Sequence, residues 1–406
     1  MLFKDVIAQE EIKNHLVQLL NQNRLSHALL FLGKEGSGAL PLALAFANFV
    51  SLFSSGNDTA QNHNSLFGDE PEQIAESVAT NWQEADAFIQ QRAAYAKVAG
   101  MVHPDIHFSY PVIPRKSGDK PLSTDYASEW REFVKQYPYG NGYDWLQFIG
   151  AENKQGNITA YECADIIRKL SLKSFESNYK ILLMWLPEYL GNEGNKLLKL
   201  IEEPPPNTLF LLVAENESLI LPTILSRTQL IKVPPLQSAD IQNALVQRGA
   251  VGAEQARQIA LVAEGNYHEA LQLLQHAGED WQSLLREWLN AILKTGPAAQ
   301  VKWIEEISRL GREKQKQFLR YFNHLLQQAI RLQIIPSFGE QLPEAERDFA
   351  GRLNKIATLP QHQAIIEELD KAAYYIERNA NAKMLFHALT IKLYHIIAKK
   401  EVIELR

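Results

Sequence analysis

The chemistry that this sequence suggests begins at a glycine-rich segment, Gly33-Lys34-Glu35-Gly36-Ser37-Gly38-Ala39-Leu40. Gly33 and Gly38 are separated by four residues, as in the pattern G-x-x-x-x-G-K-[S/T], whose backbone cradles nucleotide phosphates. The lysine of that pattern reaches the β- and γ-phosphates and the hydroxyl binds Mg²⁺, but Ala39 and Leu40 stand at these two positions. We therefore expect a turn that keeps glycine for its backbone freedom and has lost the side chains of nucleotide hydrolysis.

The segments on either side of this turn predict a strand and a helix. Ala28–Leu32 is a short continuous apolar run, typical of a strand buried on both faces of a parallel sheet. Leu42–Val50 has helical composition, and Pro41 falls early in that helix, where a missing N–H costs little. Strand, glycine turn and helix in this order form a phosphate-cradling unit.

The glycines of the turn allow two interpretations. Backbone N–H groups at a helix N-terminus attract phosphate unaided, so Gly33, Gly36 and Gly38 could still form an anion nest. Alternatively, they only close a tight turn from strand to helix. Because the lysine is missing and Leu40 stands at the metal position, we favour the tight turn and expect no cofactor.

Composition and charge limit the classes of function. A chain of 406 residues can hold two to three domains, and 46% hydrophobic with 22% charged residues is ordinary for a soluble protein. The net charge of −6 provides no global basic character, so DNA contact would need a local patch or partner chains. Residues 1–5 do not resemble a signal peptide, and the longest apolar run, Ala39–Phe53, is too short to span a bilayer. We expect a cytoplasmic protein with no membrane partner.

Metal chemistry is not expected. The single cysteine, Cys163, excludes an internal disulfide framework and a Cys-based zinc site, and its helical segment predicts a buried, inert thiol. His103 and His107 are spaced i, i+4 but lie on a proline-bounded extended segment, so they do not share a helical face.

The order of the predicted elements indicates an α/β domain followed by helices. Tyr179–Leu186 and Thr208–Ala214 are further buried strands, and their alternation with helices favours a doubly wound parallel sheet. Pro234-Pro235 marks a domain boundary, and no long strand-like run follows it. The predicted helices are 8–22, 160–173 and 191–203, then 238–248, 253–264, 267–276, 280–294, 299–310, 313–334, 343–356, 362–378 and 382–400; between the first strands lie a polar loop at 54–70, helical composition at 72–99, an extended segment at 103–112 and an aromatic, partly helical segment at 126–150.

Four segments together resemble the clamp-loader subunits of bacterial DNA polymerase III, within the AAA+ ATPases. The combination of a run ending in Glu-Glu-Pro-Pro with a later Leu-Pro-Thr-Ile-x-Ser-Arg is specific for this family. The match is clear over residues 1–236, and only the helical architecture supports it beyond them. The segments are His27–Gly33, His103–Ile106, Asn195–Pro205 and Leu221–Gln229.

The chain departs from the family pattern at the ATP machinery. Family members end a strand with Asp-Glu, which hold Mg²⁺ and polarise water, whereas here Ile181–Met184 leads into Trp185-Leu186. Active members carry a Gly-x-x-Arg arginine in the second helical domain, and Gly265-Asn266-Tyr267-His268 has a histidine there. Residues 51–102 also lack the four cysteines of the zinc module that many members carry. The resemblance therefore implies a member that keeps the fold without hydrolysing ATP.

The resemblance implies a role for Ser226 and Arg227. They follow a short helix-like element, Pro222–Leu225. In the family this arginine projects into the ATP site of the neighbouring subunit and stabilises charge on the γ-phosphate, as an arginine finger acting in trans. We expect Arg227 to keep this role.

Two further groups of charged residues each allow a functional and a structural interpretation. Glu202 and Glu203 are adjacent on a helix and point about 100° apart, so we expect a helix end that contacts a neighbouring subunit instead of an acid–base pair. In the family, the helix that carries Arg168, Lys169 and Lys173 lies near the path of duplex DNA. These residues could contact the DNA backbone or form a solvated basic face, and we favour the solvated face.

The last predicted helix, 382–400, is apolar around most of its circumference. Such a helix is either central to its own domain or shared with another chain. The resemblance implies the second in part, because C-terminal domains of clamp loaders pack into a ring. We expect Asn379-Ala380-Asn381 to cap this helix.

The sequence thus predicts three domains: a P-loop AAA+ α/β domain over 1–234 with an insertion at about 51–158, a small helical lid over 235–278 and an all-α collar over 279–406. The implied function is support of ATP-driven loading of a sliding clamp onto primed DNA. The implied partners are the ATPase and clamp-opening subunits and, through the complex, the clamp and primer–template DNA. The alternatives are an autonomous NTPase that uses Lys34 and a AAA-derived adaptor unrelated to replication.

Overall fold

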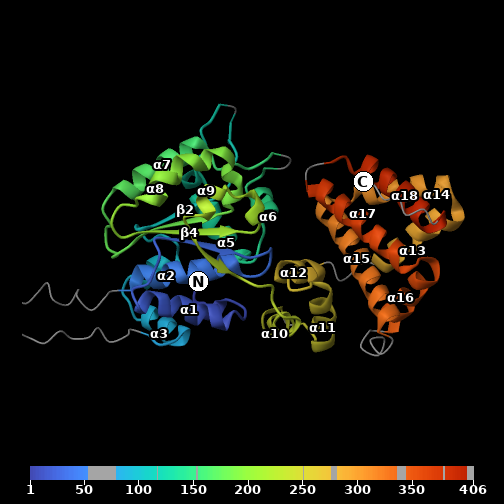
Figure 1. Ribbon diagram of the computed structural model, residues 1–406, viewed down its shortest axis with the longest axis horizontal. Helices are drawn as coiled ribbons and strands as arrows, with labels where there is room; N and C mark the ends of the chain where they lie inside the picture. Colours follow the sequence, from blue (N-terminus) through green and yellow to red (C-terminus); the bar gives the residue numbers. More distant parts are fainter. Residues whose placement is uncertain are drawn as a thin grey trace, which may run out of the picture. The chain divides into compact units, whose positions relative to one another are not determined.

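The computed structural model divides the chain into two compact units, Met1–Gln272 and Leu273–Arg406 (Figure 1). The predicted boundaries at residues 234 and 278 remain predictions. The structure describes residues 1–53, 79–116, 118–151, 154–249, 251–275, 281–335, 344–377 and 380–399, so the predicted loop at 54–70 lies outside the described residues.

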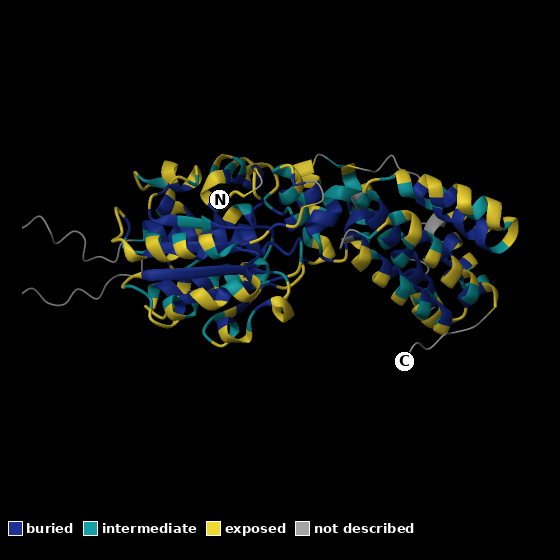
Figure 2. Cartoon of the chain, turned by 90° about the horizontal axis from the view of Figure 1, so that it is seen from above, coloured by how far each residue is buried: buried dark blue, intermediate teal, exposed yellow. Residues whose placement is uncertain are grey.

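A parallel five-stranded sheet forms the centre of the first unit, with the strand order β2-β3-β4-β1-β5. The central strands are apolar runs, and they are buried because helices cover both faces (Figure 2). Leu30 of β1 pairs with Leu212 of β4 on one side and with Leu230 of β5 on the other. The strands are β1 (Ala28–Leu32), β2 (Ile106–Ser109), β3 (Lys180–Trp185), β4 (Thr208–Ala214) and β5 (Gln229–Lys232).

Side chains alternate along the strands between two separate cores. Leu29 and Phe31 of β1 pack into the core that contains α2, whereas Ala28 and Leu30 pack into the core that contains α7. This arrangement confirms the predicted doubly wound α/β fold. The helices of the first face are α1 (Glu10–Asn21), α2 (Ala39–Leu52), α3 (Trp82–Gln90), α4 (Tyr95–Ala99), α5 (Ala127–Gln136) and α6 (Gly142–Phe148); those of the second are α7 (Ala160–Ser171), α8 (Leu198–Glu202) and α9 (Pro222–Leu225).

One prediction about this unit is wrong, and one strand was missed. The helix predicted at 191–203 is a 3₁₀ segment over Pro187–Leu197 followed by the short α8. Gly191 has φ 49° and ψ −137°, which interrupts regular helical hydrogen bonding. The strand β5 was not expected, because it has only four residues and lies at the edge of the sheet, where just one of its residues is buried.

After β5, all the secondary-structure elements in the described residues are helices. The first three follow the sheet, and we call them the lid: α10 (Ser238–Gly249), α11 (Ala253–Val262) and α12 (Tyr267–Gln275). The second unit has its own hydrophobic core. As predicted, Asn381 caps the last helix by accepting a hydrogen bond from the Met384 N–H at 3.1 Å. Its helices are α13 (Trp281–Asn290), a π-helical turn (Ala291–Thr295), α14 (Pro297–Arg309), α15 (Arg312–Ile334), α16 (Glu344–Ile356), α17 (Leu359–Glu377) and α18 (Ala382–Ala398).

Candidate functional site

The glycine turn, residues 33–38, connects β1 to α2 as the sequence predicts. Gly36 and Gly38 have φ values of 71° and 94°, a left-handed backbone that glycine adopts without strain. A Cβ at Gly36 would overlap the Asn266 side chain of the lid, and one at Gly38 would lie 3.2 Å from the Tyr139 ring. The glycines therefore serve close packing by other parts of the chain as well as the turn itself.

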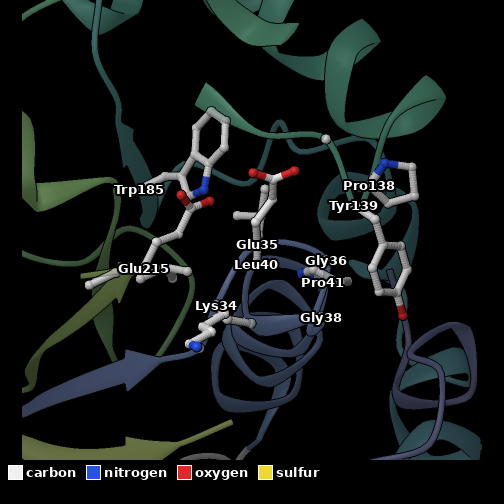
Figure 3. Close-up of a pocket in the computed structure, with 15 residues that line it drawn as sticks. Lys34, Glu35, Gly36, Gly38, Leu40, Pro41, Pro138, Tyr139, Trp185 and Glu215 are labelled. Atoms are coloured by element: carbon white, nitrogen blue, oxygen red, sulfur yellow. The ribbon is translucent and has the colours of Figure 1, made fainter. Parts of the chain in front are cut away.

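The cavity beside the turn is small. It offers about 20 Å³ to solvent, which is room for about one water molecule. Leu40 lines it from the first turn of α2 with 5% of its surface exposed, and Trp185 lines it from the end of β3 with 2% exposed. Figure 3 shows Pro138 and Tyr139 of the insertion beside the turn. The cavity's lining is completed by Gly33, Lys34, Glu35, Gly36, Gly38, Ala39, Pro41, Gly140, Val213, Ala214 and Glu215.

The insertion supplies an aromatic cluster that holds Trp185. The Trp185 ring lies 5.3 Å from Trp130 and 5.9 Å from Phe133, both on α5. The next residue, Leu186, is buried and has a left-handed backbone with φ 57°. Its side chain packs against Gly142 at the start of α6. The apolar side chains of Trp185 and Leu186 thus fill the space at the end of β3 and contact the insertion.

A charged group links the turn to the lid. His268 is 4% exposed, and its Nδ1 lies 2.7 Å from Glu35 of the turn while its Nε2 lies 2.6 Å from Asp144 of α6. Burial lowers the pKa of His268, but the hydrogen bonds to Asp144 and Glu35 and their negative charges outweigh it and raise the pKa to about 10. His268 is therefore an imidazolium at neutral pH. The sequence singled out this position only for the arginine that it lacks.

Lys34 lies in the same turn and is exposed. In Figure 3 its ammonium group points away from the side chains of Trp185 and Glu35. Two carboxylates, those of Glu35 and Glu215, belong to the residues that line the cavity. Negative charge at this position repels phosphate, because like charges raise the energy of each other's ionised form.

Arg227 lies after α9 with 34% of its side chain exposed. Its Nε donates a hydrogen bond of 2.5 Å to Glu202 Oε1, and its Nη2 forms an ion pair with the same carboxylate. Its Nη1 donates to the Thr223 carbonyl at 2.7 Å and to Ser226 Oγ at 3.1 Å. Sequence reasoning missed the partnership with Glu202, because nothing local connects two residues on separate elements.

The three basic residues of the α7 region differ in their surroundings. Arg168 and Lys169 each form an ion pair of 2.6 Å with Asp165. Burial raises the pKa of Asp165, but hydrogen bonds from Lys169 and Arg168 outweigh it and lower the pKa. Lys173 is exposed beyond the end of the helix. Two of the three positive charges are thus partly neutralised within the chain.

The cysteine and the two histidines that the sequence analysis considered make contacts typical of a structural role. Cys163 is buried as predicted, and burial raises the pKa of its thiol to about 11. Burial also lowers the pKa of His107, on β2, to about 4. His103 is buried with its Nε2 3.3 Å from Glu176. Among the described residues, no group of three or more His, Cys, Asp and Glu side chains is arranged to hold a metal ion.

The sheet order, the glycine turn after β1 and the helical lid define the class as a doubly wound parallel α/β fold with a phosphate-loop type of turn. A family model described as "DNA polymerase III, delta subunit" matches residues 72–237. The delta-prime subunit of DNA polymerase III from Bacillus subtilis is 23% identical over 265 residues, which are 65% of this chain and 59% of that protein. Over these residues, the chain is therefore similar to the delta-prime subunit of DNA polymerase III.

Three further proteins are similar to this chain. The tau subunit of B. subtilis DNA polymerase III is 26% identical over 333 residues, 80% of this chain and 46% of that protein. The chain thus spans only about half the length of these curated relatives. Among solved structures, a gamma subunit-related protein of Thermotoga maritima has 13% identity and a TM-score of 0.36, covering 93% of this chain and 98% of its own. T. maritima RuvB has 11% identity and a TM-score of 0.34, covering 69% and 63%. No helix of the described residues is long and apolar enough to cross a membrane.

Proposed function

We propose that this chain is a non-hydrolysing subunit of a DNA polymerase III clamp loader. It supports ATP-driven loading of the sliding clamp onto primed DNA and lends Arg227 to the ATP site of an adjacent ATPase subunit. Its partners would be the ATPase and clamp-opening subunits and, through the complex, the clamp and primer–template DNA. The similarity to the delta-prime and tau subunits supports this proposal.

The observation that carries the proposal is the filled space beside the glycine turn. Ligand sites in proteins typically enclose about 300–1,000 Å³. Here Leu40, Trp185 and the insertion leave room for about one water molecule. This filled space supports a chain that holds no nucleotide of its own and contributes to an ATP-driven reaction through another subunit.

Arg227 is the residue through which such a contribution would be made. Its guanidinium is at the surface, and its carboxylate partner, Glu202, is itself 43% exposed. An exposed ion pair of this kind is worth only about 0–1 kcal/mol, so an anion on a neighbouring chain can replace the carboxylate. An arginine that reaches a γ-phosphate stabilises charge that develops there during hydrolysis.

The last helix supports assembly with other chains. One face of α18 is buried in the second unit through Phe386, Leu389 and Leu393. Its other face leaves large apolar side chains in solvent: Met384 is 73% exposed and Ile391 is 57% exposed. Apolar side chains repeated along one helix face are typical of a surface that another chain covers.

The test is a reconstituted clamp loader that carries Arg227→Ala in this chain. We expect the DNA-stimulated ATPase rate to fall by about tenfold or more, since arginine fingers are worth large factors in kcat. The matched control is Arg257→Ala, which removes an ion-paired arginine from α11. A complex that assembles and hydrolyses ATP at the normal rate with Arg227→Ala would contradict the proposed finger, and Mg·ATP turnover by the isolated chain would contradict the non-hydrolysing role.

A further inference from the structure

Three charged residues that are far apart in the sequence meet at one buried point. Glu35 comes from the glycine turn, Asp144 from α6 of the insertion and His268 from the first turn of α12. The histidine is 4% exposed, and the two carboxylates are 20% and 18% exposed. We call these residues the ion triad. The triad connects the turn, the insertion and the lid through two hydrogen bonds of 2.6 and 2.7 Å.

Neighbouring contacts hold the same three segments together. The Tyr267 N–H donates to the Gly36 carbonyl at 3.2 Å, and the side chain of Asn266 fills the space where a Cβ of Gly36 would lie. The rings of Tyr139 and Tyr267 meet edge to face at 5.0 Å between centroids. The lid therefore lies directly on the glycine turn, with no gap for a ligand at these contacts.

The position of each triad member is fixed by local structure. Asp144 belongs to the capping box of α6, in which Asn141 Oδ1 accepts from the Asp144 N–H at 2.8 Å. Asn266 caps α12 by accepting from the Glu269 N–H at 3.0 Å, which places His268 in the first turn. The side-chain amide nitrogen of Asn266 also lies 3.4 Å from Glu35 Oε1. The first turns of α6 and α12 thus place the side chains of Asp144 and His268 close to each other. Little side-chain freedom is therefore lost when they pair.

We infer that the ion triad takes the place of a bound nucleotide as the link between the glycine turn and the lid, and so keeps the lid closed without any ligand. In proteins with lids, closure normally follows when a ligand contacts both sides of the hinge. Here the chain supplies both sides of that contact itself. The turn and the insertion each supply one carboxylate, and the imidazolium of the lid supplies the positive charge that joins them.

This arrangement depends on all three charges. A buried carboxylate without a cation is strongly unfavourable, because the interior does not solvate it as water does. Removal of the histidine takes the only cation of the triad away from the lid and leaves the carboxylates of the turn and the insertion uncompensated, so the lid loses its attraction to both segments. Removal of all three charges removes the attraction and leaves no carboxylate uncompensated.

The test is hydrogen–deuterium exchange of the free, full-length chain carrying His268→Gln. We expect exchange in the glycine turn, α6 and α12 to become faster by about tenfold or more, while β3 and β4 keep their protection, because only the local opening equilibrium changes. The matched control is His15→Gln on α1, an exposed histidine of the same unit, which should leave the exchange of these segments unchanged.

A second variant separates the charges from simple packing. The uncharged combination Glu35→Gln, Asp144→Asn and His268→Gln should exchange more slowly in α12 than His268→Gln alone. Equal exchange in the two would overturn the inference, as would Mg·ATP that protects the turn and the lid of the natural chain. If His268→Gln fails to fold, Asp144→Asn replaces it, with an intermediate increase expected. These measurements need no partner subunit, so they fail or succeed independently of the role of Arg227.

Discussion

The glycine turn and the Arg227 surface contain the same kind of interaction in opposite settings. In the ion triad, the His268 side chain is buried between the carboxylates of Glu35 and Asp144, and these carboxylates raise its pKa. At the surface, the guanidinium of Arg227 pairs with Glu202, and both side chains are at least one-third exposed. Burial makes the first interaction permanent, because no solvent or ligand replaces the partners. Exposure makes the second exchangeable, which a residue that acts on another chain requires.

Among the variants that test this comparison, we expect Trp185→Ala to change stability most. Trp185 is 2% exposed and packs between the turn and the aromatic residues of α5. Its truncation should lower the free energy of unfolding by about 3–5 kcal/mol through lost packing and a cavity. Urea denaturation of the purified chain measures this change. A loss of less than about 1 kcal/mol would mean that the end of β3 is not a packed core.

A second effect follows from the pH dependence of stability. Glu35 and Asp144 face His268, with the amides of Asn266 and Gln272 beside them. Because the folded pKa of His268 is raised to about 10, its contribution is fully present below the ordinary histidine pKa of about 6.5 and is lost as the pH rises toward 10.

Denaturation midpoints of the natural chain and of His268→Gln check this expectation from about pH 6, below the ordinary histidine pKa, to about pH 9.5, just below the raised one. The difference between the two chains should shrink as the pH rises. The pKa of Tyr139 is raised to about 12 by burial, so that phenol stays protonated throughout this range. A constant difference would show that His268 is not an imidazolium in the folded chain.

The smallest effect on stability is expected at the surface pair. Glu202→Gln removes the partner of Arg227 and should change the free energy of unfolding by less than about 1 kcal/mol, because both side chains are solvated. Asp144→Asn makes the same chemical change at a buried site and should cost more. Calorimetry of the two variants side by side tests the contrast. Equal losses would remove the distinction between a permanent and an exchangeable ion pair.

Much of the fold was predictable because its signals are local. The runs at Ala28–Leu32 and Thr208–Ala214 are strands with the predicted bounds, since a short continuous apolar run is typical of a strand buried on both faces of a sheet. Most helices of the second unit were predicted to within a few residues for a similar reason. The segment at 191–203 was mistaken for a single helix, because the composition of a helix does not reveal the backbone angle that Gly191 adopts.

The candidate site was predictable only in part. The missing lysine and hydroxyl at Ala39 and Leu40 are visible in the sequence, because the phosphate-binding pattern has a fixed spacing. That His268 pairs with Glu35 and Asp144 was not visible, and the same holds for Glu202 and Arg227. These partners are separated by many residues, and side chains at such separations meet only after the strands and the lid have assembled.

The sequence by itself determined that alanine and leucine follow Gly38, where the phosphate-binding pattern has a lysine and a hydroxyl, since this difference lies in residue types at neighbouring positions. Only the tertiary structure decided what fills the space: the aromatic side chains of the insertion and a histidine of the lid. The physical reason is that residue types and spacing act within a few residues along the chain. Burial and the pairing of charges depend on which segments the fold brings together.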